Sequence, residues 1–82
     1  MTTKESDMIR AKADKIMSYT SVSVRDKVDR LLFLNADQYT RLGTDTTKRA
    51  REDAEANSRY IYRLIKTIDE SLGKLLLRYR EE

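Results

Sequence analysis

Cysteine, histidine, proline and tryptophan are absent from this chain, and glycine occurs only at Gly43 and Gly73. Without cysteine the chain has no disulfide framework and no thiolate metal site, so a reducing, cytoplasmic setting is expected. Without histidine and cysteine it lacks the commonest general base, the commonest metal ligand and the strongest side-chain nucleophile. These absences favour a non-enzymatic protein that uses no cofactor and no metal.

Long apolar runs and a strong charge of one sign are missing too. The longest uninterrupted apolar run covers residues 31–34, far below the roughly 18–20 residues that a membrane-spanning helix needs. The N-terminal residues are rich in charge, so no signal peptide is expected. Seventeen basic and 14 acidic side chains leave a net charge of +3, spread over both halves of the chain. We therefore expect a soluble protein with no membrane partner.

The shortage of helix-breaking residues favours an all-α fold. Hydrophobic periodicity predicts three helices, over about residues 4–18, 24–42 and 46–80. A length of 82 residues supports one domain, 1–82, in which the two shorter helices pack on the long C-terminal amphipathic helix. A chain this short has a marginal core, so we expect dimerisation to complete the bundle.

Capping patterns set the predicted helix starts. Thr2 and Glu5 have the spacing of a capping box at the first helix, and Ser23 with Asp26 three residues later favours a second start at residue 24. Asn35 could instead cap a fresh short helix, which leaves a kink in the second helix open. Before the third helix, Gly43 has the position of a residue just past a helix end, and residues 44–46 offer candidate N-caps.

The predicted third helix carries an apolar seam that is longer than its own domain. At 1.5 Å per residue a helix of this length measures about 50 Å, whereas a compact chain of this size is roughly 30 Å across. The seam should therefore overhang the domain and be covered by a second copy, most simply in a two-fold dimer. The residues predicted to form the core and the contact between subunits are Ile61, Ile65, Ile68, Leu72, Leu75, Leu76 and Tyr79, extended by Phe33 and Leu34.

A basic face on the same helix gives an alternative. Arg59, Arg63 and Lys66 recur at i, i+4, i+7 opposite the seam, and Lys48 and Arg49 lie near the helix start, where an anion would offset their charge. A phosphate backbone would suit this arrangement. However, most of these charges have an acidic neighbour at i, i+4, as in Lys48–Glu52 and Lys66–Glu70, which is typical of a solvated helix face.

Four carboxylates on the third helix form a candidate metal site for nucleotide hydrolysis. Such a site needs carboxylates that converge from facing helices. Glu52 and Glu55 have a matching local spacing, and Asp69 and Glu70 follow downstream. Because all four lie on one helix and mostly face away from the seam, the pattern favours solvated side chains.

Residues 34–47, LNADQYTRLGTDTT, followed by residues 57–62, NSRYIY, resemble small proteins encoded by marine cyanobacterial tailed phages. The resemblance covers the middle third of the chain. It implies a viral origin and a location in the host cell or the virion, and it assigns no active residue. Taken together, the sequence predicts a small, homo-oligomeric, non-enzymatic interaction or assembly protein, with a nucleic-acid-associated accessory protein as the alternative.

Overall fold

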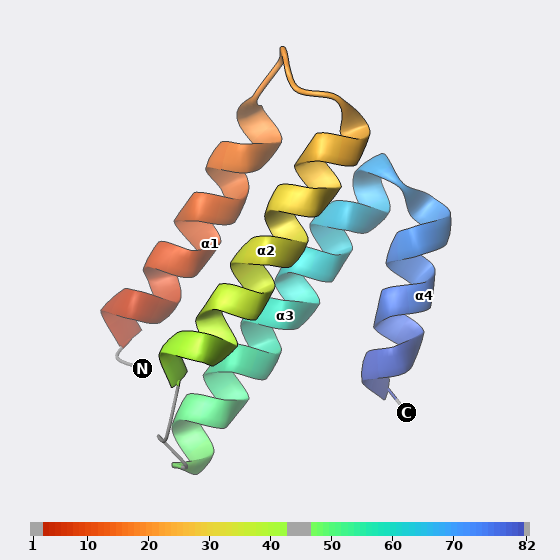
Figure 1. Cartoon of the computed structure of the whole chain (residues 1–82). Helices are drawn as coiled ribbons and strands as arrows, with labels where there is room; N and C mark the ends of the chain where they lie inside the picture. The colour runs from red at the N-terminus through yellow and green to blue at the C-terminus, as the bar shows by residue number, and fades with distance from the viewer. Residues whose placement is uncertain (1–2, 43–46, 82) are drawn as a thin grey trace.

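The computed structural model describes the backbone of residues 3–42 and 47–81 and the side chains of residues 7–41 and 47–79. The backbone described there folds into four helices and no strand: α1 (Thr3–Ser18), α2 (Val24–Leu42), α3 (Lys48–Ile68) and α4 (Glu70–Glu81) (Figure 1). The predicted all-α class is confirmed.

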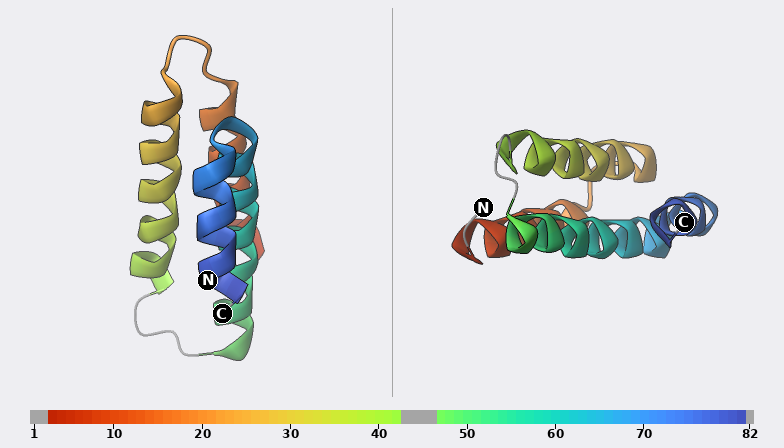
Figure 2. Two further views of the ribbon diagram at one scale, coloured as in Figure 1. Left: turned by 90° about the vertical axis from the view of Figure 1, so that its right-hand side faces the viewer. Right: turned by 90° about the horizontal axis from the view of Figure 1, so that it is seen from below.

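The helices form a three-helix core with one appended helix. Successive helices run antiparallel, and α1, α2 and α3 all pack on one another (Figure 1). Seen from below, α1 and α3 lie side by side, α2 covers both in a second layer, and α4 lies beyond the outer edge of α3 (Figure 2). No described Cα atom of α4 lies within 8 Å of one in α1 or α2, so α4 packs mainly on α3.

The core lies where α1, α2 and α3 meet. Its side chains are apolar and at most 6% exposed, so the hydrophobic effect acts mainly here. Three of them are alanines, whose small size lets neighbouring helices approach closely. The buried apolar residues are Ile9, Ala13, Val28, Leu31, Leu34, Ala50, Ala54, Ile61 and Ile65.

Side-chain hydroxyls begin α2 and α3. Ser23 Oγ accepts a hydrogen bond of 3.2 Å from the backbone N–H of Asp26, as the sequence predicts. Thr47 Oγ1 accepts one of 3.2 Å from the N–H of Ala50. The helix end predicted at Gly43, the caps predicted at residues 44–46 and the Thr2 capping box lie outside the described residues. α2 runs unbroken through Asn35, so the alternative of a fresh helix there does not hold.

The prediction of one helix over 46–80 is wrong, because the chain breaks at Asp69. Asp69 has φ −145° and ψ 88°, outside the helical region, while its N–H still donates to the Ile65 carbonyl at 2.7 Å. Its carboxylate Oδ1 accepts a hydrogen bond of 3.1 Å from the N–H of Leu72, and its carbonyl accepts one of 2.9 Å from Gly73. Asp69 therefore ends α3 and caps α4 at the same time.

Gly73 lets α4 fold back closely against α3. A Cβ atom on Gly73 would lie 2.3 Å from the Cα of Lys66 and 2.6 Å from its backbone nitrogen. Atoms cannot approach that closely, so any larger residue would push the two helices apart. Glycine here is required for close approach of two backbones, and it does not interrupt the helix, since α4 continues through it.

The fold-back changes the argument for a dimer. The molecule measures 37 × 28 × 16 Å with a radius of gyration of 12.6 Å, so it contains no helix of about 50 Å and no overhanging seam. The predicted overhang of the C-terminal helix is therefore wrong. Any self-association must rest on apolar surface that the folded chain leaves exposed.

Candidate functional site

A groove of about 500 Å³ lies between α1 and α2 on the side away from α3. Its apolar lining comes from Ile16 on α1, from Tyr19 just past the end of α1, and from Phe33 and Leu34 on α2. Leu34 is buried, whereas Phe33 is 74% exposed. Phe33 therefore stands at the mouth of the groove, with its ring in solvent.

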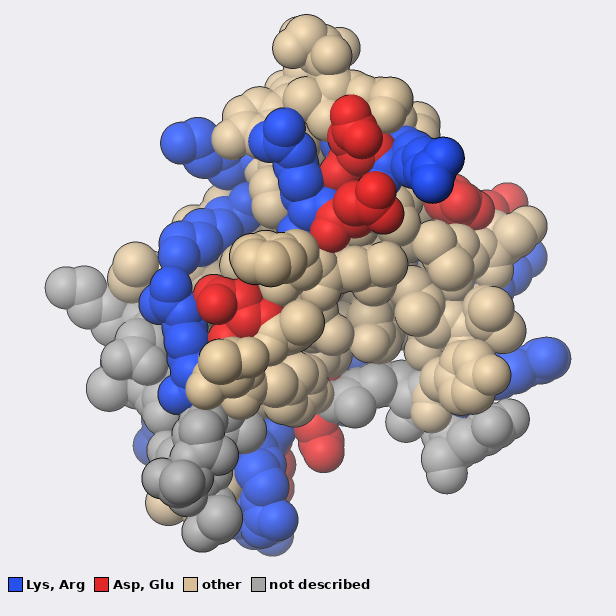
Figure 3. All heavy atoms as spheres, viewed as in Figure 1, with Lys and Arg blue, Asp and Glu red and all other residues tan. Residues whose placement is uncertain are grey.

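Charged side chains of opposite sign border this groove. α1 contributes Lys12 and Lys15, whereas α2 contributes Asp29, Asp37 and Arg30. Figure 3 shows basic side chains along α1, side chains of both signs over the upper part of α2, and uncharged surface beside them. The guanidinium of Arg30 lies over the ring of Tyr19, 5.5 Å from its centre, which is cation–π geometry.

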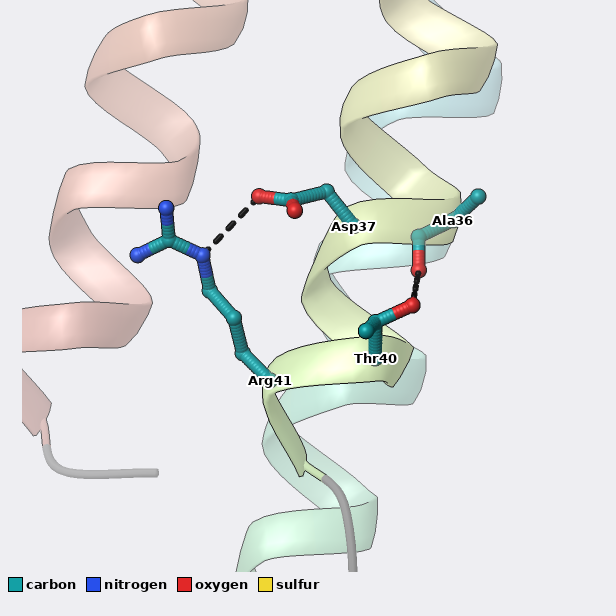
Figure 4. Close-up of polar contacts among 4 residues, drawn as sticks. All are labelled: Ala36, Asp37, Thr40 and Arg41. Carbon is teal, nitrogen blue, oxygen red and sulfur yellow. Dashed lines mark hydrogen bonds and ion pairs between the residues drawn. The ribbon is translucent and has the colours of Figure 1, made fainter.

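One of the groove's acidic groups is paired within α2. Asp37 Oδ2 accepts a hydrogen bond of 2.9 Å from Arg41 Nε, and both side chains extend toward α1 (Figure 4). On another side of α2, Thr40 Oγ1 donates to the Ala36 carbonyl at 3.2 Å. The Asp37–Arg41 pair is solvent-exposed, so its contribution to stability is small.

The predicted seam divides between the core and the surface. Ile61, Ile65 and Leu34 are buried in the three-helix core, and Ile68, Leu72 and Leu76 are half-buried around it. By contrast Leu75 is 49% exposed, Tyr79 71% and Phe33 74%. The exposed residues of the predicted seam therefore lie in two separate regions, the α1–α2 groove and α4.

The five predicted basic residues are all exposed. Lys48 pairs with Glu52 at 3.9 Å, as the spacing predicts, whereas Glu70 pairs with Lys74 at 2.9 Å instead of with Lys66. Arg59, Arg63 and Lys66 form no ion pair or hydrogen bond with any other side chain in the described part of the chain. Arg49, also exposed, does have an interaction partner.

A polar cluster occupies the interior between α2 and α3. Gln38 Nε2 donates to Asn35 Oδ1 at 2.8 Å, to the Ala54 carbonyl at 3.1 Å and toward Ser58 Oγ at 3.2 Å. Ser58 Oγ in turn donates to Asn35 Oδ1 at 2.6 Å and lies 3.1 Å from the hydroxyl of Tyr39. Gln38 and Ser58 are fully buried, so these bonds replace lost hydration.

A second polar contact joins α1 to α3. Arg10 Nε donates to Asn57 Oδ1 at 2.9 Å, and its guanidinium lies 5.4 Å from the centre of the Tyr60 ring. The Tyr60 hydroxyl donates a short hydrogen bond to Asp14. This bond to a carboxylate, aided by partial burial, raises the pKa of Tyr60 above its usual value of 10.0.

The four carboxylates of the considered metal site do not converge. Glu52, Glu55 and Glu70 are exposed on the outer surfaces of two different helices, and Asp69 caps α4. The hydrogen bond from Lys74 lowers the pKa of Glu70. Across the described residues, no three Asp, Glu, His or Cys side chains are grouped closely enough to hold a metal ion.

Comparisons of this chain with protein-family models, with curated proteins and with solved structures gave no match. In the described helices, no stretch has both the length and the hydropathy that crossing a bilayer requires.

Sequence reasoning missed most of the groove, although a signal for it is present. Lys12, Lys15 and Tyr19 recur at i, i+3, i+7 and therefore fall on one stripe that runs along α1 and past its end. This stripe is mainly polar, so a search for apolar periodicity passes over it. Which residues face the groove depends on the packing of α3 against the opposite side of the α1–α2 pair.

Proposed function

We propose that this chain is a non-enzymatic helical assembly protein that associates with further copies of itself, first as a dimer. One observation carries the proposal: Phe33 and Tyr79, two of the chain's six aromatic residues, are 74% and 71% exposed in the single chain. Large aromatic side chains are typical anchors of protein interfaces, because each buries much apolar area at a small cost in conformational entropy.

The surroundings of these rings support an interface. Phe33 stands at an apolar groove with charged borders, and Tyr79 lies one helical turn from Leu75, itself 49% exposed. An apolar centre with a polar rim is the usual anatomy of a protein–protein contact. The non-enzymatic part of the proposal rests on composition, since the chain has neither histidine nor cysteine. The proposed phage origin rests on the resemblance of residues 34–47 and 57–62.

Sedimentation velocity tests the assembly proposal. We expect the mean mass to rise from that of one chain toward twice that value as the concentration increases from about 1 to about 200 µM, because exposed apolar surface drives mass-action association. Persistence of a single-chain mass over the whole range would overturn the proposal. The same samples at high ionic strength control for loose electrostatic contacts, which salt would disperse.

The alternative is a nucleic-acid-associated accessory protein. It is favoured by the exposed Arg59, Arg63 and Lys66, which form no ion pair in the described part of the chain. Anisotropy with a labelled DNA duplex tests it. Under this alternative, binding weakens with salt and is lost in R59E/R63E, whereas R25E/R78E, which changes the same number of exposed charges on α2 and α4, keeps most of it. No binding by the unmutated chain eliminates the alternative.

A further inference from the structure

The outer surface of the α1–α2 pair, which we call the α1–α2 face, carries lysines on α1 and charges of both signs on α2. Lys12 and Lys15 belong to α1, and Asp29 belongs to α2. Within the described residues, none of these three side chains forms an ion pair or a side-chain hydrogen bond. The face therefore presents unpaired charges of both signs around the exposed ring of Phe33.

We propose that two copies of this chain pair through the α1–α2 face, about a two-fold axis that runs parallel to the helices. The inference rests on the proposed self-association and adds the surface and the orientation. Two bodies that meet face to face are related by an axis lying in the plane of contact. Such an axis can run along the helices or across them, and the charges distinguish the two cases.

An axis along the helices places α1 of one copy on α2 of the other. Lys12 and Lys15 of each copy then face Asp29 of its partner, and the attraction occurs twice. An axis across the helices would place α1 on α1 and reverse heights along them, so Lys12 and Lys15 would not face Asp29 of the partner. The charge pattern therefore favours the axis along the helices.

The heights of these residues along the helices agree with this orientation. An axis along the helices preserves height, so residues at equal distance from the α1–α2 loop meet. At 1.5 Å per residue, Lys15 and Lys12 lie about 4.5 and 9 Å from the loop end of α1, and Asp29 about 7.5 Å from the loop end of α2. Met8, 46% exposed, and Phe33 lie about 15 and 13.5 Å from those ends. Met8 of one copy and Phe33 of the other therefore meet at one level. The lysines and Asp29 meet at another level, nearer the loop.

The resulting arrangement is a four-helix bundle shared between two copies. Because α1 and α2 are antiparallel, each helix lies antiparallel to both of its neighbours, as in up-and-down bundles (Figure 1). The face is roughly 25 Å long and 20 Å wide, near the lower end of the area that stable dimers bury. A dissociation constant on the order of micromolar is therefore expected.

The charge balance of the face favours a second copy over a strongly charged partner. Lys12, Lys15 and Arg30 are nearly balanced by Asp29 and Asp37, so neither a polyanion nor a polycation gains much there. Self-pairing lets Lys12 and Lys15 of each copy meet Asp29 of the other.

Cysteine cross-linking tests the orientation, and the natural absence of cysteine makes any introduced thiol unique. One chain carries Lys15→Cys and a second, with a tag of different mass, carries Asp29→Cys. A disulfide needs Cα atoms within about 7 Å. We expect the mixture to give a mixed disulfide dimer and each variant alone to give little. Efficient linkage of Lys15→Cys to itself would overturn the proposal, and so would efficient linkage of a Leu75→Cys control through α4.

Sedimentation of matched variants separates this inference from the proposed function. Phe33→Ser should raise the dimer dissociation constant about tenfold or more, whereas Tyr79→Ser, which removes an equally exposed ring from α4, should leave it nearly unchanged. The opposite result would overturn the α1–α2 face and leave the self-association standing. An unmutated chain that remains monomeric would overturn both.

Charge exchange gives a further readout within one chain. K12E/K15E places acidic groups opposite Asp29 and should weaken the dimer, and adding D29K to that chain should restore it. Failure of D29K to restore the dimer would contradict the proposed orientation.

Discussion

Individual polar residues hold α2 and α3 in one position relative to each other. Asn35, Gln38 and Ser58 bond one another in the interior, and the Asn35 amide also donates to the Tyr62 hydroxyl at 3.1 Å. Apolar packing tolerates a small shift of one helix along another. These hydrogen bonds, by contrast, can all form only at one position of α2 along α3. Among the described residues the buried Gln38 Oε1 has no hydrogen-bond partner, so the cluster is not fully satisfied there. The gain is a fixed register, obtained at some loss of stability.

Ser58→Ala should lower the free energy of unfolding by about 1–3 kcal/mol. The change removes one of the acceptors of the buried Gln38 amide and one of the donors to the half-buried Asn35 Oδ1. Urea denaturation measures the effect. Thr67→Ala is the matched control, because Thr67 lies exposed on the same helix and bonds only the carbonyl of Leu64. Equal stability of the two variants would contradict a structural role for the cluster.

Tyr60 should titrate above pH 10, because its hydroxyl donates to Asp14 only while it keeps its proton. A raised pKa in the folded state means that this contact stabilises the fold below about pH 10 and is lost as the pH rises through the raised value. Ultraviolet absorbance of tyrosinate, taken as the difference between the unmutated chain and Tyr60→Phe, measures it. In Asp14→Ala the pKa should fall back; an unchanged titration there would show that Asp14 is not the cause.

At the scale of the helices, the sequence predicts the region of each helix but not the break at Asp69. The apolar residues Ile65, Ile68 and Leu72 keep a helical spacing across the break, so periodicity alone continues the helix. The capping signal was present, since Asp69 is followed by Glu70 in the first turn of α4. It was outweighed because both residues are also compatible with a helix interior.

The α1–α2 groove was harder to predict for a related reason. A helical wheel places both Leu34 and its neighbour Phe33 off the main stripe of α2, with Leu34 nearer its margin. Only the packing of α1 decides that Leu34 is buried and that Phe33 remains exposed. The fold class therefore follows from local patterns, whereas the candidate site depends on contacts between helices.

Asp69→Ala should reduce the free energy of unfolding by about 0.5–2 kcal/mol, because the N–H of Leu72 loses its capping acceptor. Asp69→Asn, which retains a capping oxygen, should lower the free energy of unfolding by only about a few tenths of a kcal/mol. Urea denaturation compares the two, and backbone chemical shifts at residue 69 report whether α3 and α4 begin to merge. An alanine variant as stable as the parent would contradict the capping role.

Gly73→Ala should also destabilise the protein, although alanine is the better helix former. Its intrinsic preference adds about 1 kcal/mol of stability, but the new Cβ would overlap the backbone of Lys66, and overpacking of this kind costs about 1–3 kcal/mol. Ser71→Ala, at an exposed position on α4, should show the gain without the cost. Amide exchange along α4 measures the loosening. Slower exchange in Gly73→Ala than in the parent would refute the close approach.

At the scale of the whole molecule, burial and charge are distributed in different ways. The three-helix part encloses the buried core, whereas large apolar groups remain in solvent at the α1–α2 groove and on α4. Charges of both signs cover the surface and nearly cancel, with a net value of +3. Apolar area should therefore contribute most of the energy of association, and charge should set its orientation.

The thermal midpoint should rise with protein concentration if association and folding are linked, because a dimer of folded chains draws the equilibrium away from the unfolded state. Scanning calorimetry at about 5 and about 500 µM measures this rise. Phe33→Ser should reduce the dependence on concentration. A midpoint independent of concentration in the unmutated chain would be the contrary result.

The single residue that links α3 to α4 has a consequence for chain entropy. Docking α4 on α3 closes almost no loop, whereas bringing α1 onto α3 must order all of the chain between them. The α3–α4 contact therefore costs little entropy to form. If α4 separates from α3, it should dock again much faster than α1 can return to the core.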